Sequence, residues 1–232
     1  MSKLRILTFT TLYPNAAQPS HGIFVENRMR SLVNRHALDL KVIAPAPWFP
    51  LKATSLGKYA TYARIPAAEV RQGMEIFHPR YVAIPKVGMT FAVHSLTRCL
   101  VKEARRLQAE GWDFDLIDAH YYYPDGVAAA RAGEILGKPV IITARGTDIN
   151  LIPEFPRQRR MILEASAMAE ASVAVCQALK DEMIEIGALG TKVSVLRNGV
   201  DLELFKPVDR SLIREKLDVN GTVLLSVGHL IE

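Results

Sequence analysis

The sequence predicts a doubly wound α/β fold, in which helices cover both faces of a mainly parallel sheet. Two observations support this prediction. Short, nearly continuous apolar runs alternate with amphipathic stretches from one end of the chain to the other. Continuous apolar runs are typical of parallel strands that are buried on both faces, and strand–helix alternation is typical of the connections between such strands.

The first third of the chain begins with this alternation and then departs from it. We expect strands at residues 5–10 and 40–44, a helix at 23–34, and short strands at 74–79 and 81–84. In the helix, Phe24, Met29, Leu32 and Val33 should face inward. Residues 45–66 are rich in proline and aromatic side chains, and we expect a long surface excursion. Its length points to a functional role.

The rest of the chain follows the pattern closely. Apolar residues at positions 93, 96, 100, 104 and 107 predict one helix over residues 90–108. A second helix at 125–136 should end at Gly137, a C-terminal stop signal. The remaining expected elements are strands at 116–119, 139–143, 171–175 and 192–196, and helices at 157–169 and 178–186.

Composition and charge narrow the classes of function. The 232 residues are 49% hydrophobic, and the net charge of +5 should attract anions such as nucleic acid, anionic lipid or phosphorylated substrates. The basic residues gather in two predicted helices, at Arg98, Lys102, Arg105 and Arg106, and at Arg157, Arg159 and Arg160. A solvated helix face is the simplest interpretation of both clusters, and no nucleic-acid-binding motif accompanies them.

The two cysteines and the hydropathy bear on the compartment. Cys99 and Cys176 each lie in an apolar run, which predicts buried, reduced thiols and favours the cytosol. No stretch approaches the ~20 apolar residues that cross a bilayer.

Ligands of doubly wound sheets bind at the carboxyl ends of the strands, where the strand order reverses. Four segments follow predicted strands directly: TLYPNAAQPSHG, DAHYYYPDG, TARGTDIN and LRNGVD. His21 and Gly22 close the first segment at a helix start, where backbone N–H groups could meet a phosphate; a plain loop glycine explains the pattern equally well. His120 could carry a proton or donate a hydrogen bond to a substrate hydroxyl, with a structural role as the alternative.

The third and fourth segments add polar candidates. Arg145 suits recognition of phosphate or carboxylate. Asp148, two residues after Gly146, could cap a helix, bind a sugar hydroxyl or form an ion pair with Arg145. Asn198 opens an Asn-Gly turn, and Asp201 is expected to cap a helix.

Other catalytic patterns have no support. Asp113 and Asp115 have an acid-x-acid spacing, but they precede a strand and therefore lie at the wrong edge of the sheet. The sequence holds no G-x-S-x-G, H-E-x-x-H or C-x-x-C pattern, so neither a hydrolase nor a zinc site is indicated.

Taken together, the four segments resemble the N-terminal half of a family 4 retaining glycosyltransferase with the GT-B architecture, whose two domains are Rossmann-like. The resemblance rests on the proline loop that reaches Gly22, the histidine after DLIDA, the T-x-x-G-x-D pattern, and VSVLRNGVDLELFKP. It implies an acceptor-side domain over residues 1–206, a linker over 207–220, and the first strand of a donor-binding domain over 221–232.

The resemblance also implies an activity and a set of roles. A sugar would pass from a nucleotide-sugar donor to a saccharide or lipid-linked acceptor with retention of configuration, without metal or other cofactor. Gly22 would approach the donor phosphate or the acceptor, and His120 would face the reaction centre and contact the transferred sugar. Arg145 stands where the family usually has histidine, and would add positive charge near a phosphate. Asn198 and Asp201 would hold the segment that enters the second domain.

The cysteines favour a cytoplasmic parent enzyme, and the positive charge fits peripheral contact with an anionic membrane face. The resemblance implies that the 232 residues alone should not catalyse turnover. Two alternatives stay open: a sugar-nucleotide epimerase of the same fold, and a non-catalytic Rossmann-like binding module. A nicotinamide-dependent dehydrogenase is disfavoured because the G-x-G-x-x-G fingerprint is absent.

Overall fold

The computed structural model describes residues 3–48, 58–82 and 89–228. The chain divides into two units, Met1–Asn198 and Gly199–Glu232, and each is described by itself.

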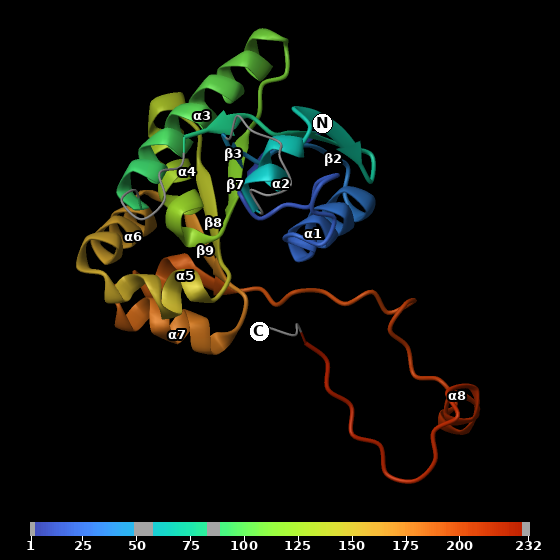
Figure 1. Cartoon of the computed structure of the whole chain (residues 1–232). Helices are drawn as coiled ribbons and strands as arrows, with labels where there is room; N and C mark the ends of the chain where they lie inside the picture. The colour runs from blue at the N-terminus through green and yellow to red at the C-terminus, as the bar shows by residue number, and fades with distance from the viewer. Residues whose placement is uncertain (1–2, 49–57, 83–88, 229–232) are drawn as a thin grey trace. The chain divides into compact units, whose positions relative to one another are not determined.

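The first unit is built on an eight-stranded sheet with the order β10-β9-β8-β7-β1-β2-β5-β4 (Figure 1). Its strands are β1 (Leu4–Phe9), β2 (Leu38–Ile43), β4 (Ala68–Arg71), β5 (Met74–Phe77), β7 (Leu116–His120), β8 (Val140–Ala144), β9 (Ala171–Ala174) and β10 (Val193–Val195). All neighbours are parallel except β4 and β5. A second, two-stranded sheet pairs β3 (Ala46–Pro47) with β6 (Arg80–Tyr81). The predicted doubly wound, mainly parallel sheet is confirmed.

Helices cover both faces of the large sheet. They are α1 (Ile23–Arg35), α2 (Lys58–Arg64), α3 (Met89–Ala109), α4 (Val127–Leu136), the short α5 (Thr147–Asn150), α6 (Pro156–Met168) and α7 (Gln177–Glu185). In Figure 1, α1 lies on one side of the strands, and α3 and α4 lie on the other.

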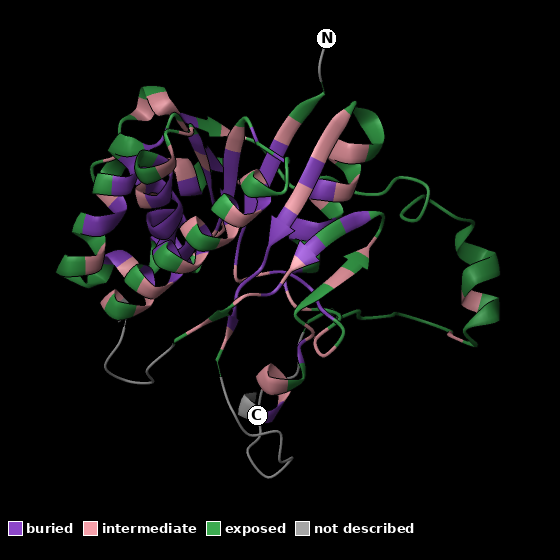
Figure 2. Ribbon diagram, turned by 90° about the horizontal axis from the view of Figure 1, so that it is seen from above, coloured by how far each residue is buried: buried purple, intermediate pink, exposed green. Residues whose placement is uncertain are grey.

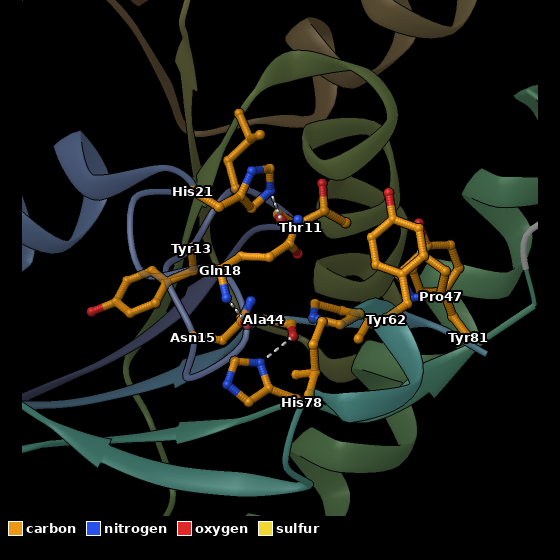
Figure 3. Close-up of a pocket in the computed structure, with 14 residues that line it drawn as sticks. Thr11, Tyr13, Asn15, Gln18, His21, Ala44, Pro47, Tyr62, His78 and Tyr81 are labelled. Atoms are coloured by element: carbon orange, nitrogen blue, oxygen red, sulfur yellow. Dashed lines mark hydrogen bonds between the residues drawn. The ribbon is translucent and has the colours of Figure 1, made fainter. Parts of the chain in front are cut away.

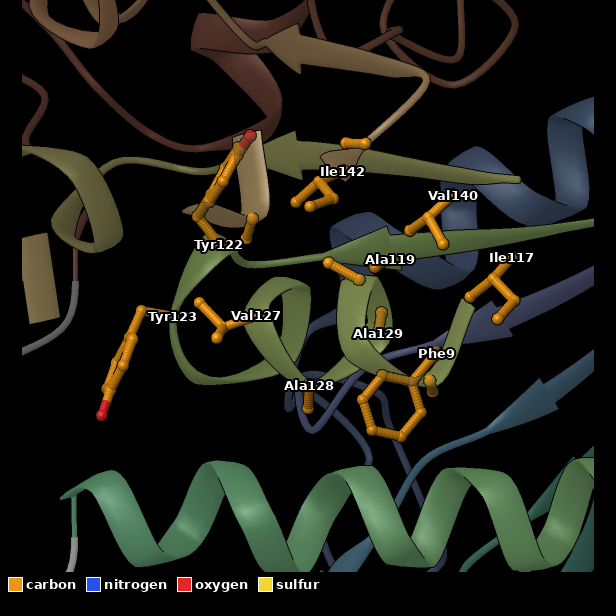
Figure 4. Close-up of a cluster of buried hydrophobic side chains, with 14 of the residues drawn as sticks. Phe9, Ile117, Ala119, Tyr122, Tyr123, Val127, Ala128, Ala129, Val140 and Ile142 are labelled. Atoms are coloured by element: carbon orange, nitrogen blue, oxygen red, sulfur yellow. The ribbon is translucent and has the colours of Figure 1, made fainter. Parts of the chain in front are cut away.

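Alternation along β1 explains why the unit has two cores. Leu7 and Phe9 point into the cluster that α3 and α4 cover, whereas Ile6 joins the cluster beneath α1. Figure 2 shows the resulting buried strands at the centre, and Figure 4 shows the α4 side of the larger cluster. The predicted stripe on α3 is confirmed, because Val93, Leu96, Leu100, Ala104 and Leu107 are all wholly buried.

Helix α4 lies unusually close to the sheet because its contact residues are small. A Cβ atom on Gly133 would lie 2.3 Å from Val140 Cγ2, and one on Gly126 would lie 2.5 Å from Ile142 Cγ2. Neither position therefore accepts a side chain without movement of the strand. Gly137 adopts φ 65 at the C-terminal end of α4, as its position predicts.

Several local expectations need correction. Phe24 is 39% exposed, and the inward face of α1 is formed by Val25 and Met29 with Glu26. The excursion after β2 contains β3 and α2, and the hairpin strand β4 was not predicted. Residues 49–57 of the expected excursion, and residues 83–84 of the strand expected at 81–84, lie outside the described residues.

The cysteines also differ from expectation. Cys176 is exposed and Cys99 is only partly buried. Burial raises the pKa of the Cys99 thiol to about 12.

Within the described residues, no helix has the length and apolar character needed to span a membrane.

The second unit contains one helix, α8 (Arg210–Lys216), among its described residues. The Asp209 carboxylate caps it by accepting hydrogen bonds from the N–H groups of Ser211 and Leu212. Asp201 makes a turn with the N–H groups of Glu203 and Leu204 instead of capping a helix. A strand was expected over residues 221–232. Its described part, residues 221–228, forms no strand, since a strand needs hydrogen bonds to a partner strand, and residues 229–232 lie outside the described residues. The domain boundary at residue 206 and the linker at 207–220 stay predictions.

Candidate functional site

The strand order reverses between β1 and β7. From β1 the chain first adds β2 on one side, and after β6 and α3 it returns to add β7 on the other. The carboxyl ends of these two strands carry Thr10 and His120, and the loop after β8 carries Arg145. A doubly wound sheet binds its ligands at this kind of junction.

Gly22 brings the start of α1 against the loop after β1. Its φ is 66, and a Cβ atom there would lie 2.3 Å from the carbonyl carbon of Leu12. Only glycine fits both the conformation and the contact. The neighbouring His21 bonds through Nε2 to the Thr11 carbonyl at 3.1 Å. The structure thus places His21 and Gly22 at the junction, where the sequence pattern predicted them.

Asp125 ties the two central strands together. Its carboxylate accepts the Thr11 N–H at 2.6 Å and the Thr11 and Thr10 hydroxyls at 2.9 and 3.3 Å. Complete burial raises the pKa of this carboxyl to about 7, against the opposing effect of these hydrogen bonds. The sequence indicated only an Asp in a turn before a helix, because nothing local reveals a partner more than a hundred residues away.

His120 lies deeper than expected. We predicted that its ring faces the reaction centre, but the side chain is wholly buried. Arg145 Nη2 lies 2.8 Å from Nδ1, and Asp118 Oδ2 lies 3.2 Å from Nε2 in poor hydrogen-bond alignment. Because an arginine nitrogen can only donate, Nδ1 must accept, and the ring is neutral with its proton on Nε2. Burial also lowers the pKa of His120, and the positive charges of Arg145 and Arg28 add to that effect.

Arg145 spans the space between the ends of β7 and β10. Nη1 donates to Asn198 Oδ1 at 2.9 Å, while Nη2 donates to His120, and the guanidinium carbon lies 5.0 Å from the centre of the Phe24 ring. Burial and the charge of Arg28 lower the pKa of Arg145 to about 10, so it stays cationic at neutral pH. Within the described residues, neither Arg145 nor Arg28 forms an ion pair with a carboxylate.

Asp148 holds the loops after β7 and β8. Its carboxylate accepts backbone N–H groups from Tyr122 at 2.6 Å, Arg145 at 3.0 Å and Gly146 at 2.7 Å. The expected alternative of an ion pair with the Arg145 side chain is wrong, because the carboxylate bonds to backbone instead. Asp148 is also fully buried, so these contacts fix the loop that presents Arg145. Gly146, at φ 143, allows the backbone to fold over this carboxylate.

A cavity of about 210 Å³ opens beside this junction, between the loops after β1, β2 and β5 (Figure 3). Its polar wall comes from the β1 loop, and Tyr62 of α2 and Tyr81 of β6 form an aromatic wall. The lining residues include Thr11, Asn15, Gln18, His21, Pro47, Tyr62, His78 and Tyr81. None of the described residues that line it is Asp, Glu, Lys or Arg.

His78 builds the floor of this cavity rather than serving as a free group. One ring nitrogen bonds to the Ala44 carbonyl at 2.8 Å, and the other bonds to Glu69 at 2.8 Å. Glu69 also lies 3.3 Å from the Ala16 N–H in the β1 loop. These contacts join the three loops, so the cavity is shaped before a ligand enters. Sequence reasoning singled out the excursion at 45–66 and the segment at 11–22, with His21 as a candidate, but it named neither Asn15 nor Gln18 and missed His78.

Asp113 and Asp115 lie at the edge of the sheet opposite to the carboxyl ends of the strands. The Asp115 carboxylate accepts the Arg5 N–H at the start of β1, and Asp113 bonds to Gln108 and Lys138. Among the described residues, no group of three or more His, Cys, Asp or Glu side chains is arranged to hold a metal.

The basic clusters on α3 and α6 have local partners. Arg106 bonds to Glu103 and Glu110, Arg160 pairs with Glu164, and Arg159 donates to the Ile186 carbonyl. These contacts favour the interpretation of both clusters as ordinary helix faces.

Comparisons with known proteins agree with this architecture. The chain is 29% identical over 236 residues to TuaC of Bacillus subtilis (strain 168), which is named as a teichuronic acid biosynthesis glycosyltransferase; the match covers 98% of this chain and 59% of TuaC. It is 26% identical to D-inositol 3-phosphate glycosyltransferase 1 of Catenulispora acidiphila, over 97% of this chain and 54% of that protein.

Among solved structures, HepE of Anabaena in complex with UDP-glucose superposes with a TM-score of 0.55 at 18% identity, over 93% of this chain and 50% of HepE. The chain thus spans between half and three-fifths of the length of these proteins. The model of Glycosyltransferase Family 4 matches residues 59–204, which is more than half of the chain. The chain therefore belongs to glycosyltransferase family 4.

Proposed function

We propose that the chain is the acceptor-side domain of an enzyme that transfers a sugar from a nucleotide-sugar donor to a hydroxyl of a saccharide or lipid-linked acceptor. Membership of the family supports the transfer itself. The names of TuaC and of the inositol phosphate enzyme support a saccharide or phosphorylated acceptor, and the HepE complex supports a nucleotide-sugar donor. Because the chain spans only part of these relatives, we assign donor binding chiefly to a second domain that follows residue 220.

The observation that carries the proposal is the neutral cavity beside the strand-order reversal. An acceptor sugar can place a ring against Tyr62 and Tyr81 and its hydroxyls against Asn15 and Gln18, the cavity residues of matching chemistry. Sugar rings carry many hydroxyls and no charge, which matches a lining of amides, hydroxyls and aromatic faces. His21 and Thr11 lie where this cavity meets the Gly22 loop (Figure 3).

The proposed reaction retains the configuration of the transferred sugar. The acceptor oxygen forms its bond to the anomeric carbon on the face from which the bond to the nucleotide diphosphate breaks, and the acceptor proton passes to an oxygen of the leaving phosphate. This chain then contributes position and electrostatic stabilisation rather than a strong base. No side chain at the junction needs to act as a nucleophile.

The test is nucleotide release by the full-length enzyme with and without acceptor. We expect release that depends on the acceptor, with the sugar recovered in an α-linkage if the donor is α-linked. An epimerase would instead convert the donor without any acceptor, and a binding module would release no nucleotide. The 232-residue chain alone should turn over far more slowly than ~1 per second.

Two finer expectations accompany this proposal. Addition of EDTA should leave the transfer rate unchanged, because the proposed reaction uses no metal. Sedimentation of the full-length enzyme with anionic vesicles tests whether it binds an anionic membrane face, as the net charge of +5 suggests.

A further inference from the structure

We expected His120 to contact the substrate, but in the structure Arg145 is the more accessible of the two side chains. The ring of His120 has no exposed atom, and Arg145 occupies its Nδ1 side. A substrate group that reaches this part of the junction from outside therefore meets the guanidinium before the imidazole. The side chain available for contact is Arg145, which is only partly buried.

Three contacts hold the Arg145 guanidinium in place. His120 Nδ1 accepts at 2.8 Å, Asn198 Oδ1 accepts at 2.9 Å, and the Phe24 ring lies beneath at 5.0 Å. All three partners are uncharged. They fix the plane of the group without an ion pair, although the charges of Asp118 and Asp148 act on it from beyond ion-pair distance. The two hydrogen bonds occupy only two of the five N–H donors.

A second cation adds to this charge. Arg28 of α1 lies close enough that its charge lowers the pKa of Arg145. Asp118 is the nearby carboxylate, but it faces His120, and Asp148 is occupied by backbone N–H groups. Among the described residues, no carboxylate forms an ion pair with Arg145, so its remaining N–H groups can bind an incoming oxyanion through paired hydrogen bonds.

We propose that Arg145, with Arg28 beside it, binds an oxyanion of the substrate, a phosphate or a carboxylate, and that His120 is a positioning residue that orients Arg145. Calling this oxyanion a substrate group rests on the proposed transfer reaction. The anion site and the role of His120 can hold even if that reaction is not the one catalysed.

The first test measures anion binding by the 232-residue chain. NMR spectra are recorded during titration with inorganic phosphate or D-glucuronate, and D-glucose is the uncharged control. Arg145→Gln removes the charge but keeps an N–H donor for His120. We expect it to weaken oxyanion binding by at least about tenfold, the loss typical of a charge-assisted hydrogen bond. Arg28→Gln should weaken binding by a smaller factor.

Arg160→Gln is the matched control, because it removes the same charge from a side chain that is 74% exposed on α6. Binding should be unchanged in this variant. Preference for phosphate would identify a phosphorylated group as the ligand, and preference for glucuronate would identify a sugar acid. Equal weakening in Arg145→Gln and Arg160→Gln, or no oxyanion binding by the wild-type chain, would overturn the anion site.

The second test separates positioning by His120 from direct contact. His120→Asn places its amide oxygen near the site of Nδ1, where it can accept from Arg145, whereas His120→Leu offers no acceptor. We expect His120→Asn to keep oxyanion affinity within about threefold and His120→Leu to lose as much as Arg145→Gln does. If the two variants behave alike, His120 does not act through Arg145.

Nitrogen-15 NMR of the His120 ring provides a direct readout that does not depend on substrate. We expect Nδ1 to be unprotonated and Nε2 protonated in the wild-type chain at neutral pH. A proton on Nδ1 would contradict the positioning role. If these tests fail while the full-length enzyme transfers sugar, only this inference is wrong. If oxyanion binding is as expected but no sugar is transferred, only the proposed reaction is wrong.

Discussion

The two halves of the sheet edge differ in charge. On the β7 and β8 side, Arg145 bonds to the buried His120 and forms no ion pair among the described residues. On the β2 and β5 side, the described residues that line the cavity supply amides, hydroxyls and aromatic rings, and none of them is Asp, Glu, Lys or Arg. The two sides therefore suit different groups: the proposed oxyanion would bind at Arg145, and an uncharged sugar ring would bind in the cavity.

Gly22 lies where the two halves meet, and changing it should have the largest effect. Gly22→Ala forces a Cβ atom into the Leu12 backbone at 2.3 Å, so the β1 loop must shift. A displacement of about 1 Å near a reaction centre can cost about 100-fold in rate. We expect kcat/KM of the full-length enzyme to fall by at least that factor.

Gly73→Ala controls for backbone strain in this experiment. Gly73 has φ 77, but a Cβ atom there would meet nothing within 4 Å. Its effect should be confined to about 1–2 kcal/mol of stability. Equal losses of kcat/KM in the two variants would show that strain, and not the Leu12 contact, explains the result at Gly22.

Asp125 ties the β1 strand, which borders the neutral cavity, to the β7 side, and its titration should be measurable as pH-dependent stability. Burial raises its pKa from near 3.8 to about 7. The folded protein thus keeps this proton to higher pH than the unfolded chain, so the stabilisation is complete below about pH 4 and is lost as the pH rises through about 7. The slope should be on the order of 1 kcal/mol per pH unit.

Asp125→Asn removes this titration, and urea unfolding between pH 4 and 8 measures the change of slope. The variant should lose the decline of stability between about pH 4 and 7, whatever its absolute stability. Asp201→Asn, on an exposed turn, is the control and should leave the slope unchanged. An unaltered slope in Asp125→Asn would mean that the carboxylate is ionised throughout this range.

The neutrality of the cavity can be tested by adding a charge. Gln18→Glu places a carboxylate in the lining, which should repel an anionic group and cost desolvation for any acceptor. We expect the acceptor KM to rise by about tenfold, equivalent to 1.4 kcal/mol, with kcat and the donor KM nearly unchanged.

Gln72→Glu, on an exposed turn, adds the same charge away from the cavity. It should change neither constant. A rise in the donor KM of Gln18→Glu with no change for the acceptor would assign the cavity to the donor instead.

The smallest effect is expected for charges that already have partners. Arg106 bonds to Glu103 and Glu110 on the surface of α3. Arg106→Gln should lower the free energy of unfolding by no more than about 1 kcal/mol and leave transfer unchanged, because exposed ion pairs contribute little. Thermal unfolding measures the change in stability, and a rate assay measures the transfer activity. A large loss of activity would show that this surface of α3 takes part in the function.

Most of the fold could be predicted from local sequence. The period of apolar residues in α3 and the apolar runs of β1, β7 and β8 depend on neighbours within one element, so a pattern reveals them. The hairpin strand β4 escaped because its burial alternates weakly and it includes an exposed Val70. Phe24 was misplaced because its contact is the Arg145 guanidinium and not the core.

A doubly wound sheet, and the loops in which the polar candidates lie, could be predicted from the residues alone, since strand ends and helix starts are local features. The role of each side chain depends instead on the folded arrangement. Folding buried His120 behind Arg145, engaged Asp148 with backbone, tied Asp125 to Thr11, and gathered Gln18, Tyr62 and His78 around one cavity. These partners lie far apart along the chain, and solvent exposure and hydrogen bonding arise only when folding brings them together.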